Sequence, residues 1–192
     1  MADCFDGISK AIISNCTTQG SGGLEVVAWV FNRKDLTITY DSTTKNLITN
    51  LANVSTKQGY KLTGIKKMLN AGSDLVVADD KADSWTHYFN FKQFEFSAAD
   101  IVNVDNINDV IVFVENKDKS TTGDGVFMGF GCKFGLYKST DTHRTNDDKG
   151  ARNIELTSLA DQEEPFSRYV FLKTDYATSK ALLETLVTTP GT

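Results

Sequence analysis

The aromatic stretch Trp85-Thr-His-Tyr-Phe-Asn-Phe-Lys-Gln-Phe-Glu-Phe96 decides the fold class, because large apolar side chains recur at nearly every second position. A period of two is typical of a β-strand that buries one face. The preceding region, Gly59 to Val77, is also rich in apolar residues, and the strongly polar residues 79–84 lie between the two. We therefore predict one long hairpin with an acidic tip. A chain of 192 residues cannot cover such a hairpin, so part of it should project and be covered by another molecule.

Short strands are expected on both sides of this hairpin, because β-branched and aromatic residues gather in short runs between polar turns. The expected strands are Leu24–Phe31, Leu36–Tyr40, the short strand or edge Asn46–Leu51, Val110–Val114, the Gly-containing Val126–Tyr137 and Ala151–Thr157. The run Val110–Val114 is apolar throughout, which is typical of a strand buried on both faces. Residues 140–150 are expected to form a charged loop.

Two helices are expected. The first begins after Ser97, a good N-cap residue, and Asp100 stands at its third position, near the positive end of the helix dipole. The second covers Ala177–Val187, where leucines recur on one side.

The chain therefore divides into an N-terminal arm (1–23), a β-rich domain (24–172) and a C-terminal extension (173–192) that is expected to be helical. The expected fold class is mainly β (α+β): a sandwich or barrel of antiparallel strands with one flanking helix, a projecting hairpin and two arms.

Composition and charge narrow the classes of function. The 40% of hydrophobic residues can form a real core, and 20 basic against 25 acidic residues give a net charge of −5. Tight binding to DNA phosphates usually requires the opposite sign, so a dedicated DNA-binding protein is disfavoured. No apolar run reaches the roughly 18 residues that span a bilayer, and the first residues lack a signal-peptide pattern. We therefore expect no membrane partner and a protein that folds where it is made.

A search for catalytic, cofactor-binding or metal-binding residues yields none. His87 and His143 have no partner at metal-ligand spacing, and the three cysteines form no C-x-x-C pair. The acidic loops lack the Gly and Glu positions of a calcium loop. The aromatic strand lacks the basic surroundings of a single-strand nucleic-acid groove. The expectation is therefore a protein that is not an enzyme and needs no cofactor.

The order of elements nevertheless resembles a known family. An early Cys and a Gly-Gly precede the first strand, and a Tyr-Asp turn and a Tyr-x-Leu strand follow. The remaining matching segments are Val-Ile-Val-Phe-Val-Glu (110–115), Met-Gly-Phe-Gly-Cys-Lys-Phe-Gly-Leu (128–136), Asp-Lys-Gly ending at Gly150, and Leu-x-x-x-Ala-Asp-Gln-Glu-Glu ending at Glu164. Over residues 4–172 the chain resembles the tail-tube-like proteins of tailed phages that infect Bacteroidetes, including the connector ring proteins of crAss-like phages.

The resemblance implies a tail-tube-like subunit with two packed, roughly orthogonal antiparallel sheets and a flanking helix. Six or twelve copies would close into a ring whose channel passes genomic DNA transiently and without sequence specificity. The protein would be made in the bacterial cytoplasm and located in the virion tail or neck, beside adjacent rings, the portal or other tail proteins. The segment Thr174–Thr192 is a departure from the family pattern, and it favours a single neck ring over a repeating tube.

Within that interpretation the acidic balance has a purpose, because a channel that neutralised phosphates would hold the DNA. The hairpin and the arms are expected to hold neighbouring subunits. The residues predicted for this interface are Asp79, Asp80, Lys81, Asp83 and Trp85 in the hairpin, and Phe5 and Ile8 in the N-terminal arm.

The alternative is a monomeric β-sandwich module that binds a carbohydrate or a receptor. Such a module would carry an exposed Trp at its site, whereas Trp29 and Trp85 lie within or at the start of apolar strands.

Overall fold

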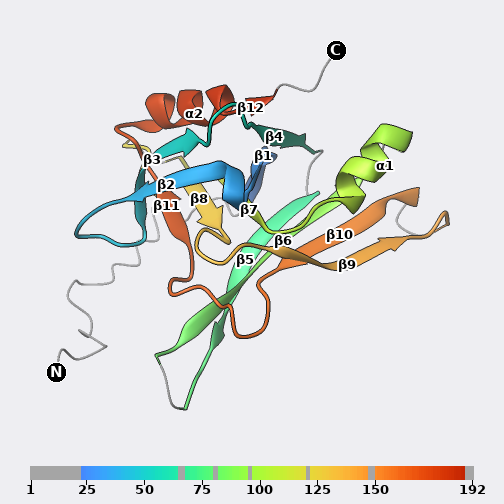
Figure 1. Cartoon of the computed structure of the whole chain (residues 1–192), viewed down its shortest axis with the longest axis horizontal. Coiled ribbons are helices and arrows are strands. Elements are labelled where there is room, and N and C mark those ends of the chain that lie inside the picture. The colour runs from blue at the N-terminus through green and yellow to red at the C-terminus, as the bar shows by residue number, and fades with distance from the viewer. Residues whose placement is uncertain are drawn as a thin grey trace.

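Figure 1 shows the computed structural model, which describes residues 23–64, 68–79, 82–94, 97–119, 122–146 and 150–188. Its strands form two sheets. Sheet A has the order β12-β4-β1-β7-β8-β11-β3-β2, and sheet B has the order β5-β6-β10-β9. Within the described ranges neither order closes into a barrel, and a mainly-β fold is confirmed.

The elements of sheet A are β1 (Leu24–Asn32), β2 (Leu36–Tyr40), β3 (Leu47–Asn53), β4 (Gly59–Thr63), β7 (Val110–Asn116), β8 (Phe127–Phe130), β11 (Tyr169–Phe171) and β12 (Val187–Thr188). Sheet B contains β5 (Leu69–Val76), β6 (Ser84–Gln93), β9 (Tyr137–His143) and β10 (Arg152–Thr157). A one-turn 3-10 helix, η2 (Arg33–Asp35), joins β1 to β2, and the α-helices are α1 (Ala98–Asp105) and α2 (Tyr176–Thr185). Sheet A is mixed rather than purely antiparallel, because β11 runs parallel to β3 and β12 parallel to β4.

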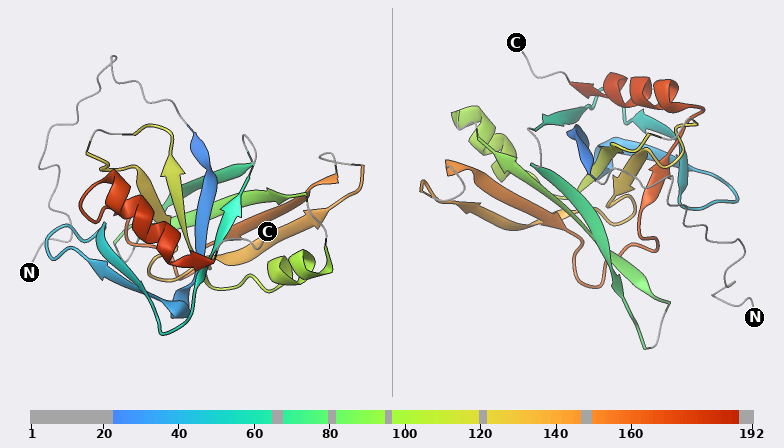
Figure 2. Two further views of the ribbon diagram at one scale, coloured as in Figure 1. Left: turned by 90° about the horizontal axis from the view of Figure 1, so that it is seen from above. Right: turned by 180° about the vertical axis from the view of Figure 1, so that it is seen from behind.

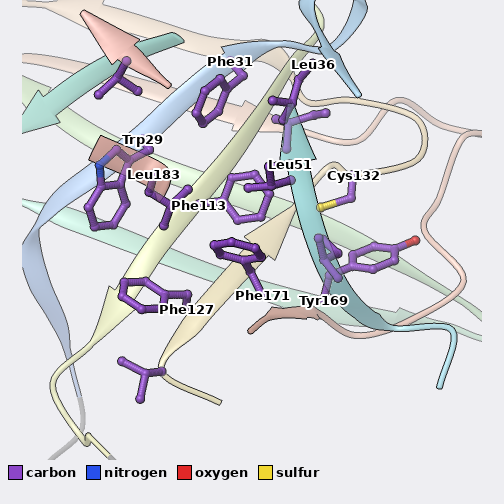
Figure 3. Packing of buried hydrophobic residues seen from close by; sticks show 14 residues of the cluster. Trp29, Phe31, Leu36, Leu51, Phe113, Phe127, Cys132, Tyr169, Phe171 and Leu183 are labelled. Carbon is purple, nitrogen blue, oxygen red and sulfur yellow. The ribbon is translucent and has the colours of Figure 1, made fainter. Parts of the chain in front are cut away.

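Strand β7 lies at the centre of the fold and is buried on both faces, as its apolar run predicted. Val112 and Val114 pack with Phe89 and Leu156 of sheet B, so the two sheets meet on this side. Its opposite face contributes Phe113 to a second cluster, drawn in Figure 3, which also holds aromatic residues of β1, β8 and β11. Sheet A therefore separates two apolar layers.

Helix α2 covers the second of these layers. Leu183 is fully buried in it, and the short strand β12 adds Val187. Asp175 caps the helix by accepting the N–H of Thr178 at 2.7 Å. The expected C-terminal arm is therefore corrected for residues 173–188: this segment is helical, as predicted, but packs against sheet A because its leucine side faces the core (Figure 2).

The predicted hairpin is also shorter than expected. The pairing of β5 with β6 runs from Leu69↔Phe91 to Val76↔Ser84, whereas β4 pairs with β1 in sheet A. The apolar residues of 59–77 thus belong to two strands in different sheets, because apolar content indicates burial and not the partner strand.

The Gly-containing stretch 126–137 is likewise divided between β8 in sheet A and β9 in sheet B. Gly131 and Gly135 have φ of +70° and +86°, and the Gly135 N–H donates to the Gly131 carbonyl at 3.0 Å. These left-handed positions suit glycine and turn the chain from one sheet to the other. The charged loop expected over residues 140–150 is also shorter than predicted, because β9 continues to His143.

Helix α1 begins as predicted, with the Ser97 hydroxyl accepting the Asp100 N–H at 3.2 Å. Two basic side chains of sheet B hold its C-terminal end. The Lys138 ammonium donates to the Val104 carbonyl at 2.9 Å, and Arg152 pairs with both Asp105 and Asp141. Positive groups at this end complement the helix dipole and fix α1 beside β9 and β10.

Candidate functional site

The β5–β6 hairpin projects beyond the body of the molecule, as Figure 1 shows at the lower edge and Figure 2 shows from behind. Its pairing continues without a register shift to Val76↔Ser84. Among the predicted interface residues, Asp79 is exposed at the tip, while Asp83 and Trp85 are half-buried. The predicted residues Asp80, Lys81, Phe5 and Ile8 lie outside the described residues.

One face of the hairpin carries an apolar stripe that runs from the core into solvent and is interrupted once, by the polar pair Ser73↔His87. Phe91 and Phe89 are buried against sheet A, at 3% and 0% exposure. Further along the same face Leu75 stands opposite Trp85 and is 49% exposed, and Val77, just beyond the paired strand, is 71% exposed. Exposed apolar side chains that continue a core stripe are candidates for contact with another molecule.

The base of the hairpin is fixed to the segment before β11. Trp85 and Glu164 exchange two backbone hydrogen bonds of 2.8 Å each. Two residues onward, the His87 N–H donates to the Ser158 hydroxyl at 3.1 Å, and the Ser158 N–H donates to the His87 carbonyl at 3.0 Å. The hairpin therefore leaves the body of the protein in a defined direction.

Beneath this base lies the buried His87, for which the sequence offered no partner at metal-ligand spacing. The His87 Nδ1 accepts the Gly131 N–H at 3.1 Å, so Nε2 carries the proton and donates to the Phe166 carbonyl at 2.8 Å. Burial lowers the pKa of His87 to about 4, which keeps the ring neutral. Both ring nitrogens of His87 are engaged in hydrogen bonds that hold three chain segments together, so this ring is not available as a catalytic base.

Glu164 makes a second buried junction near His87. Its carboxylate accepts the N–H groups of Lys133 and Phe134 and the hydroxyl of Tyr169, at distances of 2.9 to 3.3 Å. Burial raises the pKa of Glu164, and burial also raises the pKa of the Cys132 thiol. A protonated thiol is a poor nucleophile. These groups serve structure, and nothing in the polar run around Glu164 marked it in the sequence as a buried residue.

The outer face of sheet B, which points away from sheet A, is polar. Alternation places Phe89 and Ile154 inward. The outward residues are Asn70, Asp74, Val76, Ser84, Thr86, Tyr88, Asn90, Lys92, Thr140, Thr142, Asn153, Glu155 and Thr157. This set carries two acidic groups and one basic group. A shallow hollow of about 250 Å³ lies over it, between Asn70 and Thr140.

Both edges of sheet B are open within the described structure, because β5 and β9 each pair on one side only. Edge strands present unpaired backbone groups that can pair with another chain. Sheet B thus combines an apolar inner face, a polar outer face and two edges available for pairing.

The described residues contain no cluster of His, Cys, Asp and Glu side chains that could hold a metal ion, and no described helix could cross a membrane. Trp29 is fully buried in the core, so it is not a surface platform. Comparisons with protein-family models, curated proteins and solved structures found no match.

Proposed function

We propose that this protein is a structural subunit of a ring or tube in the tail or neck of a tailed bacteriophage. Six or twelve copies would surround a channel through which DNA passes. The observation that carries the proposal is sheet B, whose open edges β5 and β9 lie on opposite sides of a four-stranded sheet. Copies that join β9 of one to β5 of the next would extend the sheet around a closed ring, because heterologous contacts close when the rotation permits.

The outer face of sheet B suits the wall of such a channel. It is polar, and Lys92 is its one basic group against Asp74 and Glu155 in the set of outward residues given above. A wall without excess positive charge gains little from phosphate neutralisation, so DNA would pass without being held. The apolar inner face stays against sheet A, so ring formation need not disturb the core.

The direct test is native mass spectrometry of the full chain over a wide concentration range, with negative-stain images of the same samples. Closed assemblies of six or twelve copies with a central hole are the expected result. A monomer at every concentration would contradict the proposal and favour the alternative of a monomeric binding module.

A further inference from the structure

The exposed end of the hairpin combines apolar and acidic side chains. We define the hairpin tip as residues 74–79 and 82–84, which contain three aspartates and no lysine or arginine, a net charge of −3. Within it Leu75 and Val77 are largely exposed. Asp83 accepts the N–H of Ala78 at 3.2 Å, which links the two strands beyond their last backbone pair.

A hollow of complementary character lies on sheet A, beside β2. It has a volume of about 620 Å³, and we call it the β2 hollow. Its apolar lining is Ile38, Tyr40, Pro165, Phe166 and Tyr169, and its cationic residues are Lys45 and Lys133. Both lysines are exposed. The lining also includes Asp41, whose carboxylate accepts the N–H groups of Thr43 and Thr44 at 2.9 and 2.7 Å.

The hairpin tip cannot reach the β2 hollow of its own chain. The hairpin is fixed at Trp85 by its two bonds to Glu164, directly before Pro165 at the hollow. Beyond that point one further pair, Val76↔Ser84, follows, and Figures 1 and 2 show the strands of the hairpin running away from sheet A. An apolar tip and an apolar hollow that cannot meet within one chain can meet between two copies.

We infer that the hairpin tip of one copy docks into the β2 hollow of a second copy. Leu75 and Val77 would cover the apolar lining, and Asp79 and Asp83 would face Lys45 and Lys133. The opposite charges of the two surfaces favour this partner, because charge complementarity selects and orients an encounter. The inference rests on the proposed function, since it names a second contact between copies beside the pairing of β9 with β5. The contact is heterologous, as a ring or a stack of rings requires.

Disulfide trapping in the full chain tests this contact. In a background in which Cys4 and Cys16 are serine, one chain carries Val77→Cys and another carries Ser42→Cys; the buried Cys132 is retained. We expect a covalent dimer in the mixture and in neither chain alone. The matched control replaces Ser42→Cys with Val54→Cys, at a site that is 43% exposed outside the hollow. Crosslinking no greater than this control would overturn the inference, and so would efficient linkage of Val77→Cys chains to themselves.

A charge swap provides an independent readout. Asp79→Lys and Lys133→Glu each change an exposed side chain, so both variants should fold. We expect each change alone to weaken self-association about tenfold, and an equal mixture of the two to recover part of the loss. Absence of any recovery would contradict the pairing of these charges.

The outcomes separate this inference from the proposed function. If rings form but Val77→Cys and Ser42→Cys do not crosslink, the proposed ring stands and the docking of the hairpin tip is wrong. A monomer at every concentration would remove both. An intramolecular disulfide between Cys4 and Ser42→Cys, in a chain that retains Cys4, would assign the hollow to the N-terminal segment and overturn the docking of the hairpin tip.

Discussion

The two ends of the β5–β6 hairpin differ in what covers them. Near Phe89 and Phe91 the inner face is sealed by sheet A, while at Leu75 and Val77 the same stripe is open to solvent. The covered end belongs to the folding core of one chain. The open end is exposed and adds little to the stability of that chain, and the proposed contact between copies would bury it.

The largest effect on the free energy of unfolding is expected from a substitution in the core. Phe113 has no exposed surface and packs on both Phe31 and Phe171. Phe113→Ala should lower the free energy of unfolding by about 3–5 kcal/mol, because it opens a cavity in the central strand. Denaturant unfolding of the monomeric protein measures the loss. A cost below about 1 kcal/mol would contradict the central place of β7.

The next effect concerns the fixed base of the hairpin and depends on pH. The pKa of His87 is lowered to about 4 from an ordinary 6.5, so the unfolded chain takes up a proton first as the pH falls. The His87 contribution is therefore complete above pH 6.5 and is lost between pH 6.5 and about 4, by roughly 3 kcal/mol.

Because burial raises the pKa of Glu164, that group acts in the opposite direction, and the raw pH profile mixes the two effects. The comparison of wild type with His87→Gln isolates the histidine, since Glu164 is present in both. We expect the difference in unfolding free energy between the two proteins to shrink as the pH falls through this range. A difference that does not change with pH would show that His87 is not buried as a neutral ring.

A third, smaller effect tests the turn that divides the chain between the sheets. Gly131 and Gly125 both have positive φ, at +70° and +74°. A Cβ at Gly131 would lie 2.7 Å from the Leu136 side chain, whereas one at Gly125 would meet nothing within 4 Å. Gly125→Ala should cost about 1 kcal/mol of strain, and Gly131→Ala clearly more. Equal melting temperatures for the two variants would refute the tight turn.

The smallest effect on the single chain is expected at the tip. Leu75→Ser should change the unfolding free energy of the monomer by less than about 0.5 kcal/mol, because its side chain is already half exposed. Self-association should nevertheless weaken strongly, and sedimentation across concentrations would reveal it. If Leu75→Ser instead destabilised the monomer as much as a core substitution, the contrast between the two ends would fail.

Local patterns in the sequence predicted most elements correctly. Runs of β-branched and aromatic residues between polar turns located β1, β2 and β10, the apolar run located the doubly buried β7, and Ser97 marked the start of α1. Each of these features depends on residues that are close together in the chain, so the sequence alone was enough to predict them. The assignment of strands to sheets depends on distant residues, and for that reason the division between β4 and β5 was missed.

The candidate site was predictable only in part. The acidic tip and the apolar strand β6 are visible in the sequence, and so the projecting hairpin was expected. The β2 hollow could not be predicted from the sequence. Its residues Lys45, Lys133 and Phe166 are far apart in the chain and come together only in the folded structure. The contact of Trp85 with Glu164 at the base of the hairpin likewise joins residues far apart in the chain.

The central claim is that sheet B joins copies through its two edges, and amide hydrogen exchange tests it most directly. The full chain is compared in its assembled and dissociated forms, with peptides from β5, β9 and β2. Strand β2 is the matched control, because it is an edge of sheet A and has no part in the proposed ring. The account predicts that β5 and β9 gain protection on assembly and β2 does not. Exchange in β5 and β9 that stays the same in both forms would contradict it.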